Sequence, residues 1–250
     1  MEKHNRRVSE VVVARDLVEL SRIAADLFVQ VVRDSVAARG RAVVALSGGS
    51  TPKALFQLLA TDEYRVQVDW DRLLFFFGDE RNVPAESQES NYRTANENLF
   101  LPLKLGTENI YRWKTELGDA SAVAEDYEAA IGSVFADVFP VFDLIFLGMG
   151  GDGHTASLFP GTAGLDEKIR VAMANDVPQL ATTRFTLTFP VINSAKNVAF
   201  LVAGADKAAA LERVLEGDSD FHELPSRAVR PRPGNLYWYL DAAAAQGLSS

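Results

Sequence analysis

The sequence predicts an α/β fold of three layers, α/β/α, in which helices cover both faces of a mostly parallel, Rossmann-like central sheet. Two observations support this prediction. From the N-terminus to about Gly217, short apolar runs alternate with segments whose apolar residues recur at helical spacing. The runs are apolar on both alternating faces, as in parallel strands buried between two helix layers. No linker rich in Gly, Ser or Pro divides the chain, so we expect residues 1–250 to form a single domain.

The individual elements follow from the same patterns. The first strand is expected over residues 8–13, and the first helix from Leu17, with Gly40 as its stop. Further strands are expected over residues 41–47, 73–77, 144–147, 184–189, 198–202 and 236–240. Further helices are expected over residues 52–60, 91–99, 120–135 and 205–215. The polar stretch over residues 219–233 is predicted to be a long loop near the functional site.

The composition argues against several classes of protein. With 34 acidic and 25 basic residues, the net charge of -9 would repel nucleic acids and anionic lipids, so we expect neither nucleic-acid nor membrane partners. Cysteine is absent and only three His are present, which argues against disulfides, a dedicated metal centre and any cofactor held by them. No apolar run reaches the roughly 20 residues of a membrane span, and no signal-peptide core is visible. We expect a cytoplasmic monomer that acts on a small molecule without a cofactor.

A short Gly-containing segment between a predicted buried strand and a predicted helix is the first candidate site. Its backbone N–H groups can turn toward an anion, Thr51 can cap the helix, and Pro52 suits the first helical position. The alternative is an ordinary tight turn. The segment lacks the Lys-Ser/Thr ending of a P-loop. We predict a phosphate cradle formed by Ser47, Gly48, Gly49, Ser50 and Thr51.

The second candidate site directly follows the triple-Phe strand. Asp79 could accept hydrogen bonds from sugar hydroxyls, and Arg81 could offset negative charge that develops during a reaction. A solvated loop or a local Asp–Arg pair is an equally good explanation of these charges.

The segment over residues 148–160 is the most informative, because it combines four glycines with a carboxylate and an imidazole. Asp152 and His154 supply these groups directly after a buried strand. A dinucleotide fingerprint does not continue with Asp-Gly-His, and the chain has no Gly-x-Ser-x-Gly elbow for a Ser nucleophile. We therefore expect water to be the nucleophile and His154 to be its base.

Two cations complete the candidates. Arg184 and Lys207 would each be read as solvated surface if taken alone. Lys207, however, is expected in the first turn of a helix, where the helix dipole disfavours a cation unless an anion lies nearby. An anionic ligand would explain its position.

Taken together, these motifs resemble the 6-phosphogluconolactonase family, which is related in fold to the glucosamine-6-phosphate deaminases. The resemblance covers nearly the whole chain and includes residues 47–52, 79–81, 90–92, 148–160, 184–188 and 204–207. It implies a deaminase/isomerase-like fold and hydrolysis of 6-phospho-D-glucono-1,5-lactone to 6-phospho-D-gluconate, the second step of the oxidative pentose phosphate pathway. It also implies that residues 48–51, Arg184 and Lys207 hold the 6-phosphate and that His154 is the catalytic base. Asp152 would orient His154 or bind a substrate hydroxyl, and Arg81 or glycine N–H groups would stabilise the oxyanion.

Two alternatives remain. In the deaminases the related motif carries an acidic residue five positions after the His, where this chain has Phe159, and this difference favours the lactonase. A non-catalytic sugar-phosphate sensor with the same fold is the other alternative, although such a protein would have no use for a competent His154. Phe185 departs from the smaller aliphatic residue usual in the family and affects only the core.

Overall fold

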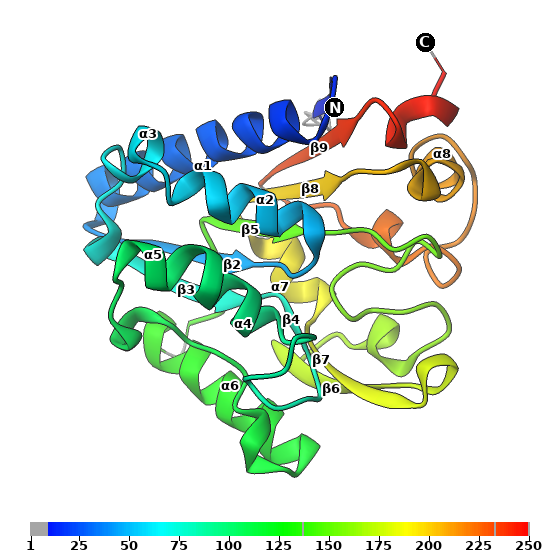
Figure 1. Ribbon diagram of the computed structural model, residues 1–250. Helices are drawn as coiled ribbons and strands as arrows, with labels where there is room; N and C mark the ends of the chain where they lie inside the picture. Colours follow the sequence, from blue (N-terminus) through cyan, green and yellow to red (C-terminus); the bar gives the residue numbers. More distant parts are fainter. Residues whose placement is uncertain (1–9, 137, 233, 250) are drawn as a thin grey trace, which may run out of the picture.

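The computed structural model describes residues 10–136, 138–232 and 234–249, and its centre is a parallel sheet (Figure 1). Six strands in the order β1-β9-β8-β5-β2-β3 form this sheet, and every neighbouring pair is parallel. Helices pack around the sheet, which confirms the predicted three-layer α/β architecture. The strands are β1 (Glu10–Ala14), β2 (Ala42–Leu46), β3 (Leu73–Phe77), β5 (Leu144–Leu147), β8 (Asn197–Val202) and β9 (Asn235–Asp241).

Apolar side chains on both faces place these strands in the centre of the molecule. All five residues of β2 and all four of β5 are buried. The long helix α1 (Leu17–Arg39) packs against α2 (Ser50–Leu59) and against several strands of the sheet. Helix α6 (Ala120–Phe135) places Tyr127 against Phe76 of β3, and the Tyr127 hydroxyl donates to the carbonyl of Phe77 over 2.8 Å. Among the described helices, none is long and apolar enough to cross a membrane.

A second, smaller sheet lies beside the first and was not predicted. Three antiparallel strands form it in the order β4-β7-β6: β4 (Asp79–Arg81), β7 (Thr182–Leu187) and β6 (Ala172–Val177). Asp79 and Arg81 are therefore strand residues rather than loop residues. The predicted strand over residues 184–189 is correct as far as Leu187. It is wrong at its end, because Pro190 near the start of α7 (Phe189–Ser194) favours a helix there.

Several predicted boundaries need correction. Helix α2 begins at Ser50 with Gly49 as its N-cap, so Pro52 is not its first residue and Thr51 does not cap it. The helix predicted over residues 91–99 is α4 (Asn91–Ala95), which continues through a π-turn (Asn96–Phe100) into α5 (Leu101–Leu103). The last predicted helix divides into a 3₁₀ turn (Ala205–Lys207) and α8 (Ala208–Leu215). The ends of α1 and α6 agree with prediction, whereas residues 8, 9 and 233 lie outside the described residues.

The remaining short elements join these parts. They are α3 (Asp62–Arg65) and 3₁₀ turns at Trp70–Arg72, Thr107–Asn109, Thr115–Leu117, Ala163–Asp166, Pro178–Leu180, Pro225–Ala228 and Ala244–Gly247. Because β2, β5 and β8 are parallel neighbours, the turns that follow them meet at one edge of the sheet. The phosphate-cradle segment, the His154 segment and Lys207 follow these three strands.

Candidate active site

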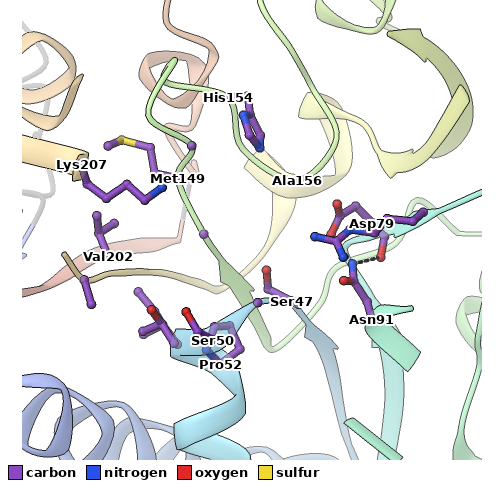
Figure 2. A pocket seen from close by; sticks show the side chains of 18 residues that line it. Ser47, Ser50, Pro52, Asp79, Asn91, Met149, His154, Ala156, Val202 and Lys207 are labelled. Carbon is purple, nitrogen blue, oxygen red and sulfur yellow. Dashed lines mark hydrogen bonds between the residues drawn. The ribbon is translucent and has the colours of Figure 1, made fainter. Parts of the chain in front are cut away.

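A cavity of about 250 Å³ lies at this edge of the sheet (Figure 2). Figure 2 shows side chains from three directions around it: Ser50 from the start of α2, His154 from the turn after β5, and Lys207 beyond β8. Asp79 of β4 lies on the side opposite Lys207. The cavity is lined by Ser47, Gly48, Gly49, Ser50, Thr51, Pro52, Asp79, Arg81, Asn91, Gly148, Met149, Gly150, His154, Ala156, Leu201, Val202, Ala203 and Lys207.

The turn after β2 is shaped to present its backbone to a ligand. Gly49 has a φ of 105°, a conformation that L side chains rarely adopt, and it precedes the first turn of α2. Orphan N–H groups at the start of a helix attract anions. The first helical turn carries no acidic residue that would compete for this place. This geometry suits an anionic group such as a phosphate.

Lys207 lines the same cavity but already has a partner. Its ammonium lies 2.9 Å from Asp206 Oδ2, and this hydrogen bond lowers the pKa of Asp206. Asp206 therefore offsets the unfavourable helix dipole at this position, so the position of Lys207 does not by itself require an anionic ligand. With 27% of its side chain exposed, Lys207 can still reach a ligand in the cavity.

His154 and Asp152 form one rigid unit. Asp152 Oδ1 lies 2.6 Å from His154 Nδ1 and also accepts the His154 backbone N–H over 3.1 Å. Partial burial is the largest single influence and raises the pKa of Asp152, but the hydrogen bonds and the charge interaction with His154 together outweigh it, so the pKa of this carboxyl is lowered. An ionised Asp152 needs a proton on Nδ1, which leaves the lone pair on Nε2. No described residue bonds Nε2, so this nitrogen is free for chemistry at the cavity.

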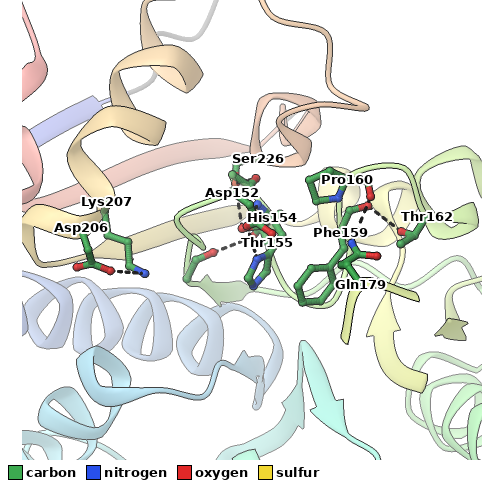
Figure 3. A network of polar contacts seen from close by, with 12 residues as sticks. Asp152, His154, Thr155, Phe159, Pro160, Thr162, Gln179, Asp206, Lys207 and Ser226 are labelled. Carbon is green, nitrogen blue, oxygen red and sulfur yellow. Dashed lines mark hydrogen bonds and ion pairs between the residues drawn. The ribbon is translucent and has the colours of Figure 1, made fainter. Parts of the chain in front are cut away.

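The surroundings of His154 hold its ring in place. Phe159, which is buried, stacks on the imidazole with ring centroids 4.0 Å apart. Gly150 lies so close to the ring that a Cβ there would overlap it. The Ser226 hydroxyl donates to the carbonyl of Gly153 over 2.8 Å, next to Asp152 and His154 (Figure 3). Ser226 belongs to the predicted loop over residues 219–233, so this loop does support the site.

Asp79 is buried and both of its carboxylate oxygens are engaged. Oδ1 accepts from Asn91 Nδ2 over 3.0 Å, and Oδ2 accepts from Ser157 Oγ over 2.8 Å. Ser157 belongs to the segment that carries His154. Asp79 thus connects the start of α4 to the segment that carries His154, and it forms no ion pair with Arg81 among the described residues.

The two predicted arginines face each other in the second sheet. Arg81 of β4 and Arg184 of β7 are register partners, and Arg81 lines the cavity whereas Arg184 does not. Burial lowers the pKa of Arg184, and the neighbouring charge of Arg81 lowers it further. Arg184 Nε is buried without a partner in the described structure. The structure therefore groups Arg184 with Arg81 rather than with Lys207.

Asn91, a buried residue that lines the cavity, was not among the predicted site residues. The sequence signals were its place in the family-like segment over residues 90–92 and its position directly after Ser90, which caps α4 by accepting the Arg93 N–H. Glu80 accepts the backbone N–H groups of Asn91 and Tyr92 over 2.8 and 2.9 Å, and burial raises the pKa of Glu80 despite these bonds. Neighbouring carboxylates of β4 therefore hold both the backbone and the side chain of Asn91.

The chain is similar in sequence and in fold to known proteins. Residues 15–238 match the family model of glucosamine-6-phosphate isomerases/6-phosphogluconolactonase. A 6-phosphogluconolactonase of Synechocystis sp. is 40% identical over 220 residues, which cover 86% of this chain and 88% of that protein. A solved structure of 6-phosphogluconolactonase from Trypanosoma cruzi has a TM-score of 0.87 at 30% identity and covers 100% of both chains. A monomeric glucosamine-6-phosphate deaminase, with a TM-score of 0.79 at 20% identity, shares the fold. The chain belongs to the glucosamine-6-phosphate isomerase/6-phosphogluconolactonase family.

Proposed function

We propose that the protein hydrolyses 6-phospho-D-glucono-1,5-lactone to 6-phospho-D-gluconate, with His154 as the base that activates water. The observation that carries this proposal is the fixed imidazole, whose Nδ1 is held by Asp152 at 2.6 Å while Nε2 is free at the cavity. The lactonases among the relatives, at 40% and 36% identity, support the same reaction.

The reaction requires one base that later serves as an acid. Nε2 of His154 takes a proton from water as the water oxygen attacks the lactone carbonyl carbon. The tetrahedral intermediate then collapses, the bond from carbon to the ring oxygen breaks, and the imidazolium returns its proton to that oxygen. Asp152 stabilises the imidazolium while it exists. Arg81 offers positive charge at the cavity for the oxyanion.

The 6-phosphate would lie at the turn after β2. Backbone N–H groups at the start of α2 and the ammonium of Lys207 provide its binding site. Arg184 does not line the cavity, and it would act on the phosphate only from its place beside Arg81 in the second sheet. We therefore assign Arg184 a smaller share of phosphate binding than Lys207.

The position of Phe159 favours this reaction over deamination of an amino-sugar phosphate. In the deaminases the corresponding residue is a carboxylate that opens the sugar ring. Phe159 carries no proton to transfer, and it stacks on His154 as an apolar support. A lactone has no closed hemiacetal to open, so it needs no such acid.

The test follows the decay of 6-phosphogluconolactone, generated in situ by a dehydrogenase, with wild-type protein and with His154→Asn. Asn retains a donor near the Nδ1 position but lacks Nε2. We expect kcat to fall by about 10² to 10⁴. Lys207→Ala should instead mainly raise KM, more than Arg184→Ala does.

The matched control for this test is His222→Asn. His222 repeats the geometry of His154, with Nδ1 2.6 Å from Asp220 two positions earlier, but it does not line the cavity. Turnover of His222→Asn should stay near that of wild type. Full activity of His154→Asn would refute the base assignment, and ammonia release from glucosamine 6-phosphate would support the deaminase instead.

A further inference from the structure

The side chain of Asn91 has only one favourable orientation. Its Nδ2 donates to two acceptors of Asp79, the backbone carbonyl over 2.9 Å and Oδ1 over 3.0 Å. The opposite amide orientation would place Oδ1 against these two acceptors and is electrostatically unfavourable. Figure 2 shows Asn91 beside Asp79 with this contact drawn. Asp79 therefore determines where Asn91 Oδ1 points.

Asn91 Oδ1 points at the turn that follows β2. It is buried and has no hydrogen-bond partner in the described structure. The atoms that a Cβ at position 48 would meet are all from the Asn91 carboxamide, and Oδ1 and Cγ would overlap that Cβ. The carbonyl oxygen thus occupies the space beside Gly48 in which any other residue would have its Cβ. A buried polar atom without a hydrogen-bond partner needs an explanation, and the close fit of Oδ1 against Gly48 offers one.

Glycine at position 48 is therefore required by this contact and not by backbone conformation. Gly49 has a positive φ, but Gly48 is absent from the residues with positive φ. The three atoms nearest to a Cβ at position 48 all belong to the Asn91 side chain. Asn91 and Gly48 come from elements far apart in the sequence and form one fitted pair.

We propose that Asn91 is a positioning residue. It fixes the Gly48–Gly49 turn in the position that is required to bind the substrate's anionic group. Its backbone is anchored by Glu80 and its side chain by Asp79, so its place relative to the second sheet is fixed. The same Asp79 carboxylate holds Ser157 in the segment that carries His154. Asp79 and Asn91 therefore set the distance between the anion-binding turn and the base. This inference rests on the proposed function for the identity of the anionic group.

The experiment uses a second-site rescue. Gly48→Ala adds a Cβ that overlaps Asn91, and Asn91→Ala removes the three atoms nearest to this Cβ. We expect Gly48→Ala to weaken binding of 6-phosphogluconate, measured by calorimetry, by about 10-fold to 100-fold, as for the loss of one charge-assisted hydrogen bond. The double variant should recover the part of this loss that comes from the overlap and should bind like Asn91→Ala alone, which lacks the positioning contact. KM should follow the same order, whereas kcat of Gly48→Ala should change less.

Matched controls separate positioning from general destabilisation. Gly78→Ala places a Cβ at 3.6 Å from the Leu46 carbonyl, an ordinary contact, and should show no rescue when it is combined with Asn91→Ala. Asn91→Asp keeps the shape but faces Asp79 with an acceptor, and it should weaken 6-phosphogluconate binding even where thermal unfolding shows a folded protein. If the double variant binds no better than Gly48→Ala, or if Gly48→Ala binds like wild type, the proposal is overturned.

The binding measurement distinguishes this proposal from the proposed function. One outcome is that the wild type binds 6-phosphogluconate and the double variant shows the rescue, but the wild type does not accelerate lactone decay. This outcome would refute the lactonase reaction and leave the positioning role intact. Hydrolysis of the lactone by the wild type, with no rescue of binding in the double variant, would refute the positioning role alone. Absence of both binding and hydrolysis in the wild type would refute both.

Discussion

The carboxylate of Asp152 determines which nitrogen of His154 is available at the cavity. Because Asp152 Oδ1 holds Nδ1 at 2.6 Å and the pKa of Asp152 is lowered, the carboxyl is ionised at neutral pH and keeps the proton on Nδ1. Two residues of sequence separation are sufficient for this contact, since the turn at Gly153, with a φ of 78°, folds the chain back.

We predict that Asp152→Asn lowers kcat more than it raises KM. Asn lacks the charge that stabilises the imidazolium and can also hold the wrong tautomer. The loss should be about tenfold, because the carboxylate is half-exposed and water screens part of its interaction. Steady-state kinetics of the lactonase reaction measures it, with Asp220→Asn as the equivalent change next to His222, outside the cavity. A change confined to KM would assign Asp152 to substrate binding instead.

At the residue scale, sequence could identify groups that follow strands but not groups whose role depends on a distant partner. His154, Asp79 and Lys207 line the cavity because the ends of neighbouring strands meet at one edge. Arg184 pairs with Arg81 only through the second sheet. The contact between Asn91 and Gly48 likewise requires elements that no local pattern brings together.

At the scale of elements, helices with a cap and a long apolar face could be predicted, whereas short elements could not. Helix α6 begins after Asp119, whose side chain accepts the Ala122 N–H, and its bounds agree with the prediction. Strand β6 has the sequence Ala-Met-Ala-Asn-Asp-Val, in which small and polar residues give no strand pattern, and it is defined by pairing with β7. Helix α7 has six residues, too few for a period to be recognised.

Helix α1 offers a test of stability that is separate from activity. Its N-cap Asp16 accepts the Glu19 N–H over 2.9 Å, and Gly40 ends it in the left-handed conformation. We predict that Asp16→Ala lowers the free energy of unfolding by about 1 kcal/mol, measured by urea denaturation, without changing kcat/KM. Asp34→Ala makes the same chemical change at an exposed position inside α1 and should cost nothing. Equal effects of the two variants would contradict the capping role.

At the scale of the whole molecule, the loop over residues 219–232 connects the segment that carries His154 to other parts of the chain. The loop that contains Pro225–Ala228 supports Gly153 through the Ser226 hydroxyl, and Arg227 of the same turn donates to carbonyls at the end of α8. The catalytic segment is therefore connected to the helix that begins beside Lys207. His222 connects the same loop to Asp166, which lies after the His154 segment.

The His222 contact should make stability depend on pH. Hydrogen bonds to Asp166 and to Asp220 raise the pKa of His222 above its ordinary value. A raised pKa in the folded state stabilises the fold fully at pH values below the unfolded pKa of about 6.5, and this contribution is lost as pH rises through the folded pKa. We predict that His222→Gln lowers the Tm at pH 6, and that the difference from wild type disappears in alkaline solution.

Thermal unfolding of both proteins from pH 5.5 to pH 9.5, a range chosen to bracket an ordinary histidine pKa of about 6.5, measures this difference. The effect should be small, because His222 and its partners lie at the surface, where water and salt screen the ion pairs. Added salt should reduce it further. Glu223→Gln, which removes the neighbouring pair with Arg213 and leaves His222 in place, is the control, and its Tm difference from wild type should stay constant with pH. A Tm difference for His222→Gln that is equally constant with pH would mean that His222 acts by packing and not by its charge.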